Sequence, residues 1–194
     1  MKRTATFTRE TSEMTISGRL DLDGDGSSQA RTGLGFLDHM LATLAKHGRF
    51  DLEIVATADH RVDDHHTVED CAIVIGRAID EALGDRVGID RYGYAFAPLD
   101  ESLCRAVVDL SGRPWPEISI EFSRDQIGDV ATESLIHFFR SLAIEARMGL
   151  HIDLIRGDND HHKAEAAFKA LALALRAAVN VAGGDVPSTK GTLT

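Results

Sequence analysis

An internal repeat constrains the fold of this chain more than any single motif does. Residues 63–70 read "DDHHTVED", in which two adjacent histidines precede a glutamate, and residues 159–166 read "NDHHKAEA" with the same spacing. Upstream of each, a stretch with one further histidine also recurs, as "FLDHMLATLA" at 36–45 and "SLIHFFRSLA" at 134–143. The chain is therefore expected to contain two copies of one structural unit.

Each copy is predicted to run strand, turn, helix, strand, loop, helix. Apolar residues at helical spacing predict helices at 36–47, 65–83 and 161–179. Gly48 is expected to stop the first helix at C′, and Asp63 and Asp64 are cap candidates for the second.

Alternating apolar residues predict the strands. The first strand of each half is expected at Met14–Leu22 and at Leu103–Leu110, and the blurred alternation of the latter suggests a more buried strand. Further alternation follows at 50–54 and 150–154, whereas residues 83–100, rich in glycine and charge, are expected to form a connector. The predicted fold class is α+β, a tandem duplication with strands on one side and helices on the other. Residues 1–194 are expected to form a single domain of two repeats, about 1–90 and 91–194.

Composition excludes several classes of function. The net charge of −10, without a cluster of Lys or Arg, argues against nucleic acid as a partner. No apolar run approaches the ~20 residues of a membrane span. The N-terminal "MKRTATFTRE" lacks the apolar core of a signal peptide, so a cytoplasmic location is expected, with Cys71 and Cys104 as two buried thiols in no metal-binding spacing.

The repeated element has the spacing of a metal site. Residues four apart lie on one face of a helix, so the first histidine and the glutamate of each element can converge on one ion. The second histidine points about 100° away and can reach a different ion. A single element of this kind is more often a surface ion pair, but its recurrence beside a further histidine favours metal binding. The candidate ligands are His39, His65, His66, Glu69, His137, His161, His162 and Glu165.

Imidazole and carboxylate ligands without thiolate suit Mn²⁺, Fe²⁺, Co²⁺ or Zn²⁺, and four ligands per ion with open positions favour six-coordinate Mn²⁺. The remaining histidines fall outside this set. His151 is expected on the solvent face of a strand and His60 in a polar loop, whereas His47 could contact a substrate.

Several motifs together resemble the imidazoleglycerol-phosphate dehydratase family. They are "GFLDHMLATLAKHGRFDL", "DDHHTVED", "ALGDRVGIDRYG", "VDLSGRP", "HHKAEAAFKALALALR" and the terminal "PSTKGTL". The resemblance implies a fold similar to a duplicated second domain of ribosomal protein S5. It also implies loss of water from imidazole glycerol phosphate, giving imidazole acetol phosphate in histidine biosynthesis. Two Mn²⁺ ions per active site would bind the eight ligands and activate the substrate imidazole, in a 24-subunit homo-oligomer whose active sites lie between subunits.

The same resemblance assigns the remaining roles. Glu13 matches the glutamate that transfers protons, and Glu101, its counterpart in the second half, is expected to support the site. The positions that match substrate or phosphate contacts are Glu13, His47, Arg91, Arg113, Lys169, Ser188, Thr189 and Lys190. Lys169 also lies one helical turn after Glu165, so it can point toward the metal site.

Two other functions compete with this assignment. A di-metal phosphohydrolase also uses "DHH" and paired acidic ligands. In such enzymes the acidic metal ligands are usually aspartates, whereas the duplicated element here uses glutamate. A metal-storage or structural metal-assembly protein would leave the tail "PSTKG" and the two arginine motifs without a role.

Overall fold

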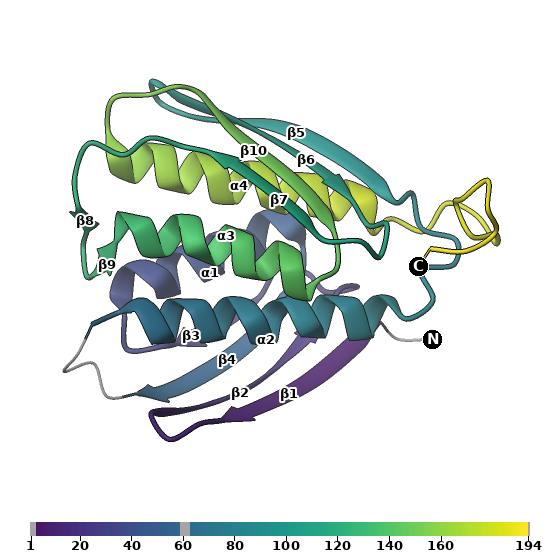
Figure 1. The fold of residues 1–194 in the computed structure, drawn as a ribbon, viewed down its shortest axis with the longest axis horizontal. Helices are drawn as coiled ribbons and strands as arrows, with labels where there is room; N and C mark the ends of the chain where they lie inside the picture. Colours follow the sequence, from purple (N-terminus) through teal and green to yellow (C-terminus); the bar gives the residue numbers. More distant parts are fainter. Residues whose placement is uncertain (1–2, 59–62, 194) are drawn as a thin grey trace.

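Two four-stranded sheets form the outer layers of the molecule, and four long helices lie between them (Figure 1). The computed structural model of the protein describes residues 3–58 and 63–193. In this part of the chain no helix is long and apolar enough to cross a membrane.

The two sheets have the same topology. The first has the order β1-β2-β4-β3 and the second the order β5-β6-β10-β7, each with three antiparallel strands and a short fourth strand that runs parallel to its neighbour. The strands of the first sheet are β1 (Thr4–Glu10), β2 (Met14–Asp21), β3 (Ser28–Arg31) and β4 (Asp51–Ala58). Those of the second are β5 (Tyr92–Leu99), β6 (Ser102–Asp109), β7 (Trp115–Ser119) and β10 (Gly149–Arg156). The tandem α+β duplication predicted from the sequence is confirmed.

The helices of one half pack against the helices of the other. They are α1 (Gly35–Gly48), α2 (His65–Leu83), α3 (Thr132–Glu145) and α4 (Asp160–Ala178). Helix α2 covers β1 and β2 and contacts α3, whereas α4 covers β5 and β6 and contacts α1. Gly76 of α2 lies so close to α3 that a Cβ there would be 2.7 Å from Cβ of Glu145. The two halves therefore share one interior.

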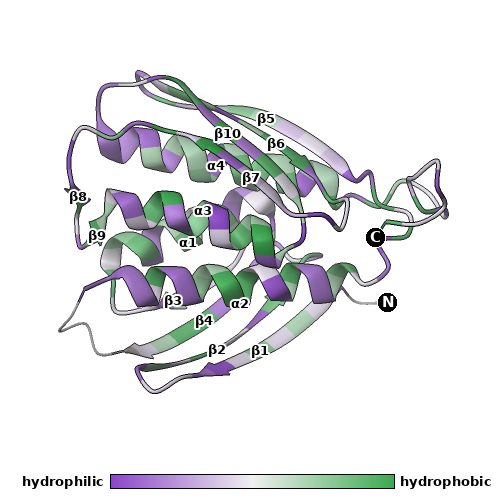
Figure 2. Cartoon of the chain, in the orientation of Figure 1, coloured by the Kyte–Doolittle hydropathy of each residue, from purple (hydrophilic) through white to green (hydrophobic). Residues whose placement is uncertain are grey.

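Apolar residues recur at helical spacing along the helices and at about every second position along the strands, which gives the elements an inner and an outer face (Figure 2). Phe138 and Phe139 of α3 pack against Phe168 of α4, with ring centroids 5.2 and 4.7 Å apart. The two thiols, Cys71 and Cys104, are free and buried, as predicted, and burial raises the pKa of Cys104 to about 12.

Helix starts are capped across the two halves. The carboxylate of Asp129, in the turn between the short strands β8 (Gln126–Ile127) and β9 (Val130–Ala131), accepts hydrogen bonds from the backbone N–H groups of Gly35 and Phe36 in α1. In the other direction, the carboxylate of Asp64 accepts from the N–H of Ala131, directly before α3. Asp64 occupies the N-cap position of α2, but its side chain makes no capping hydrogen bond to that helix. The carboxylate of Asp63 instead accepts a hydrogen bond from the N–H of His65.

Several sequence predictions were wrong in detail. The strands predicted as first in each half are the second ones, because β1 and β5 precede them, and β5 lies in the C-terminal part of the predicted connector. Strand β6 is buried on one face only, and its alternation looked blurred because its outward face carries the apolar Val107. Gly48 is the last residue of α1, and Arg49 takes the left-handed conformation after it, with φ of 57°.

Candidate metal centre and active site

Two clusters of candidate metal ligands lie on the helices. In the first, which we call the α1/α4 triad, Nε2 of His39 and Nε2 of His161 each lie 3.2 Å from Oε2 of Glu165. Helix α1 supplies the first histidine, and one turn of α4 places the other two residues on the same face.

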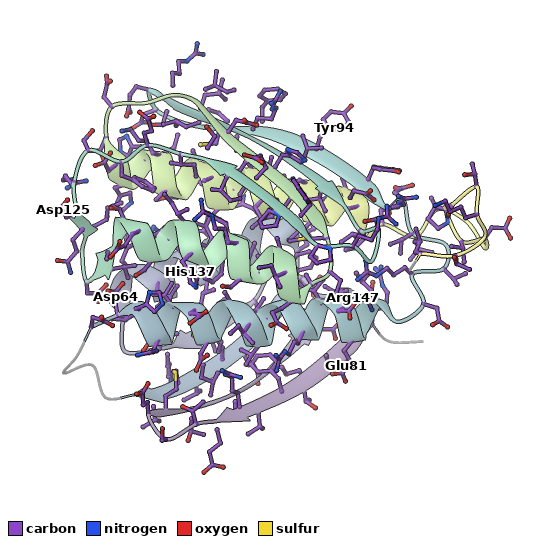
Figure 3. The ribbon with its side chains drawn as sticks, viewed as in Figure 1. Asp64, Glu81, Tyr94, Asp125, His137 and Arg147 are labelled. Atoms are coloured by element: carbon purple, nitrogen blue, oxygen red, sulfur yellow. The ribbon has the colours of Figure 1, made fainter. Side chains whose placement is uncertain are left out.

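The second cluster, the α2/α3 triad, has the same composition. Nε2 of His137 lies 2.9 Å from Oε1 of Glu69, and Nε2 of His65 lies 3.8 Å from Oε2 of Glu69. In Figure 3, His137 on α3 lies beside the start of α2, near Asp64. In both triads one nitrogen or oxygen atom from each residue lies within 4.8 Å of those of the other two.

Each triad combines residues from both halves of the chain. The sequence left open which histidines share an ion, and the structure joins the α1 histidine to the second-half element and the α3 histidine to the first-half element. This exchange follows from the packing of α1 on α4 and of α2 on α3.

The second histidine of each element lies outside its triad, as its helical position predicted. The rings of His65 and His66 are inclined at 82°, and those of His161 and His162 at 88°. Nε2 of His66 lies 3.4 Å from Oε2 of Glu13. The structure thus brings six of the eight predicted ligands into two triads and leaves two histidines directed elsewhere.

The chemistry of the triads fits a divalent cation. Ligand atoms around one ion with bonds of about 2.1 Å lie about 3 to 4 Å apart, close to the spacing of the nitrogen and oxygen atoms here. The hydrogen bond from His137 holds the pKa of Glu69 below its usual value, so this carboxylate is anionic at neutral pH. Burial opposes ionisation of Glu165, but hydrogen bonds from Lys169, His39 and His161 outweigh it and lower the pKa of this carboxylate to about 2. Two imidazoles and one anionic carboxylate are a suitable donor set for divalent first-row metals.

Two of the predicted substrate contacts lie beside the α1/α4 triad. Nζ of Lys169 lies 2.7 Å from Oε1 of Glu165, one turn along α4. Burial, followed by the nearby charge of Lys169, lowers the pKa of His47 on α1, which favours the neutral imidazole. Among the other histidines, His151 is exposed on β10 as predicted, and His60 lies outside the described residues.

The other predicted substrate contacts gather at a separate place. An open cavity of about 620 Å³ is lined by Arg91, Arg113, Ser188, Thr189 and Lys190, together with neighbouring residues of the C-terminal segment. Three cationic side chains and two hydroxyl groups around one cavity suit an anion such as phosphate.

Arg91 is also engaged by the protein itself. Its Nε and Nη2 donate to the carboxylate of Asp109 at 2.7 and 3.1 Å, and its Nη1 donates to the carbonyl of Pro187 at 2.9 Å. Arg91 therefore anchors the C-terminal segment that carries Ser188 and Lys190. Asp109 was missed in the sequence because nothing in its local pattern distinguishes it from other strand-end aspartates.

A buried ion pair supports the start of α4, and it was also missed. Nζ of Lys163 lies 2.8 Å from Oδ1 of Asp160 and donates to the carbonyl of Glu121. Oδ2 of Asp160 accepts from the N–H groups of Ser123 and Arg124. The only local signal was an acid and a base three residues apart on one helix, which is common on surface helices.

The triads and the cavity lie at opposite ends of the molecule. His161 and Glu165 belong to the first turns of α4, whereas Arg91 donates its N–H to the carbonyl of Ala178, the last residue of that helix. Nineteen residues of helix span about 28 Å at ~1.5 Å per residue. Figure 1 shows the C-terminal segment at the end of the molecule opposite to the start of α4.

A duplicated α+β scaffold with two His/His/Glu triads defines a metal-dependent enzyme class, and the comparisons with known proteins identify the family. The sequence model of imidazoleglycerol-phosphate dehydratase matches residues 32–175. A protein of that name from Salinibacter ruber is 54% identical over 193 residues, covering 98% of this chain and 96% of the relative. One from Phytophthora nicotianae is 55% identical over 98% of this chain, which spans 42% of that longer protein.

A solved structure gives the same result. The crystal structure of imidazoleglycerol-phosphate dehydratase from Staphylococcus aureus matches with a TM-score of 0.82 and 39% identity, covering 92% of this chain and 99% of that one. The chain belongs to the imidazoleglycerol-phosphate dehydratase family. It is an enzyme of histidine biosynthesis that removes water from imidazole glycerol phosphate, and the resemblance seen in the sequence is confirmed.

Proposed function

We propose that the two triads hold the divalent ions of this dehydratase, that the ions are Mn²⁺, and that two of them serve each active site. The donor set supports this proposal, since imidazole and carboxylate ligands leave open positions for a substrate on a six-coordinate ion. When bound, the ions supply Lewis acidity to the imidazole ring of the substrate.

Glu13 is proposed to transfer the proton at the reacting carbon. Its side chain is 61% exposed, and its Oε2 lies 3.4 Å from Nε2 of His66, on the side of the imidazole where a metal or substrate would bind. A carboxylate that is exposed and close to a ligand histidine can reach a substrate held there.

The cationic residues are proposed to bind the substrate phosphate. Arg113, Ser188, Thr189 and Lys190 would contact it in the cavity, with Arg91 positioning the tail. Lys169 and His47 would contact the substrate at its imidazole end, because they lie beside the α1/α4 triad.

The separation of triads and cavity supports an active site built from more than one chain. A small phosphate ester cannot span the roughly 28 Å of α4, so a second chain would supply the cavity that faces a given triad. His66 and His162, outside the triads of their own chain, would complete metal sites in the assembly. We propose a homo-oligomer of 24 subunits with active sites between subunits.

The outer face of the second sheet supports self-association. Tyr92, Tyr94 and Phe96 are 57%, 75% and 56% exposed along β5, and Tyr94 points away from the sheet in Figure 3. The corresponding positions on β1 carry threonines 4, 6 and 8. Contiguous exposed aromatic side chains are typical of protein–protein contacts, and a second copy of this chain is the proposed partner.

The whole chain is proposed to act as one domain with repeats at about 1–90 and 91–194. A cytoplasmic location suits the free, buried thiols of Cys71 and Cys104.

Replacing the cationic side chains that line the cavity tests the proposed binding of the substrate phosphate. Arg113→Met and Lys190→Met should each raise the KM for imidazole glycerol phosphate by about tenfold or more while metal content and assembly remain unchanged, because each removes a charge-assisted hydrogen bond worth about 1.5–3 kcal/mol. Arg19→Met, which removes an exposed arginine paired with Asp21 on β2, is the matched control. The assay follows product formation and free phosphate separately.

Phosphate release without the dehydrated product would instead support a phosphohydrolase. Unchanged turnover in both cavity variants would show that the phosphate binds elsewhere.

A further inference from the structure

The two glutamates related by the duplication approach their histidines from different sides. Oε2 of Glu13 lies 3.4 Å from Nε2 of His66. In the second half, Oε2 of Glu101 lies 2.7 Å from Nδ1 of His162. The first carboxylate therefore faces the outer ring nitrogen, and the second faces the nitrogen next to the backbone.

Glu101 is also fixed by its other oxygen. Its Oε1 accepts from the N–H groups of Asp158 and Asn159 at 3.2 and 2.9 Å and from the hydroxyl of Ser102 at 3.0 Å. These contacts tie the β5–β6 turn to the loop that precedes α4.

This arrangement determines which nitrogen of His162 can bind a cation. Oε1 of Glu101 accepts three hydrogen bonds, so this carboxyl group acts as an acceptor, and Nδ1 of His162 is assigned as the donor to its Oε2. In a neutral imidazole the lone pair is then on Nε2, which lies 3.9 Å from Oδ2 of Asp100. Carboxylates that accept from the second nitrogen of a ligand histidine fix its tautomer and ring orientation.

We infer that Glu101 is a positioning residue that presents Nε2 of His162 to the metal, whereas its duplicate Glu13 is the residue free to react. The inference rests on the proposed role of His162 as a metal ligand. Both oxygens of Glu101 are engaged by four donors, which suits positioning and not proton transfer. Glu13 is the more exposed of the two, at 61% compared with 36%.

Glu101→Gln separates positioning of the histidine from support of the loop. The amide oxygen can still accept from Asp158, Asn159 and Ser102, which keeps the loop in place. The amide N–H₂ group then faces Nδ1 of His162 and donates to it, so the proton moves to Nε2 and the ligand lone pair is lost.

The measurement is the number of Mn²⁺ ions that the assembled, metal-loaded protein retains per chain against a graded series of chelator concentrations. In Glu101→Gln, the chelator concentration that removes one of the two ions should be lower than in the unaltered protein by a factor of about ten or more. Glu13→Gln, the same change at the duplicate position, should retain both ions while turnover falls. Circular dichroism and particle size verify that each variant is folded and assembled.

Equal Mn²⁺ retention in Glu101→Gln and the unaltered protein would overturn the inference, because it would limit Glu101 to holding the loop. His162→Ala distinguishes this from failure of the metal assignment. If His162→Ala also retains both ions, His162 is not a ligand and the proposed metal site itself is wrong at this position. Loss of an ion in His162→Ala but not in Glu101→Gln would leave the metal site standing and overturn only the positioning role.

Discussion

The two triads share their ligands but differ in one neighbouring residue. Lys169 contacts Glu165 in the α1/α4 triad, whereas the corresponding position on α2 is Ile73. The carboxylate of one triad is thus already paired with a lysine of the protein, whereas that of the other, within the described residues, is paired with His137 and His65. The duplication has preserved the donor set and changed the charge around it.

Removing one triad histidine should remove one metal ion. His137→Ala deletes the imidazole that contacts Glu69, so we expect one divalent ion per chain to be lost and activity to fall at least a hundredfold. His151→Ala is the matched control, because this histidine is exposed on β10 away from both triads. Metal content is measured by elemental analysis after gel filtration; two ions per chain in His137→Ala would refute the assignment of this triad.

The candidate ligands could be predicted from the sequence because the spacing within one helix fixes the directions of His65 and Glu69, or of His161 and Glu165. Their pairing with His39 and His137 could not, because spacing carries no information on which helix packs against which. The hydrogen bond between Glu101 and His162 depends on the conformation of a loop, so it could not be predicted from the sequence either.

At the scale of elements, the two halves hold each other's helices in place. Asp129 accepts from the N–H of Phe36 at 2.9 Å, although the two residues are far apart in the sequence. A cap of this kind stabilises a helix only when the other half has folded around it.

Removing this cap should destabilise the whole protein without changing its chemistry. Asp129→Ala is expected to lower the free energy of unfolding by about 1 kcal/mol, because the first N–H groups of α1 lose their acceptor. Asp125→Ala, at an exposed position of the same segment, should change it by less than about 0.5 kcal/mol. Urea unfolding followed by circular dichroism compares the two, and equal stabilities would show that the cap contributes nothing.

Strands were missed in the sequence for two physical reasons. Strands β3 and β7 contain 4 and 5 residues, too few for alternation to show, and both pair in parallel with a single neighbour. Strand β5 was taken for a connector because its glycine and its exposed aromatic residues do not follow the usual inward-apolar pattern. The long helices were predicted well, since their apolar periodicity extends over several turns.

For the whole molecule, metal removal tests whether the ions join subunits. If ligands from different chains share an ion, an excess of chelator should dissociate the assembly into smaller units, because the bonds that the ion makes between the chains are lost. Light scattering measures the mass of the particle before and after chelation, and again after Mn²⁺ is restored. A particle of unchanged mass after complete metal loss would show that the ions do not hold it together.

The crossed triads also bear on the origin of the chain. Each half carries one histidine on its first helix and a histidine–glutamate pair on its second, and in the structure these combine only with the complementary set from the other half. A half-length ancestor with the same helix packing would have had no complete triad by itself, and two identical copies would have formed two identical triads. Within one chain the two copies are permanently linked, so the two sites need not stay identical, and they differ at Lys169 and Ile73.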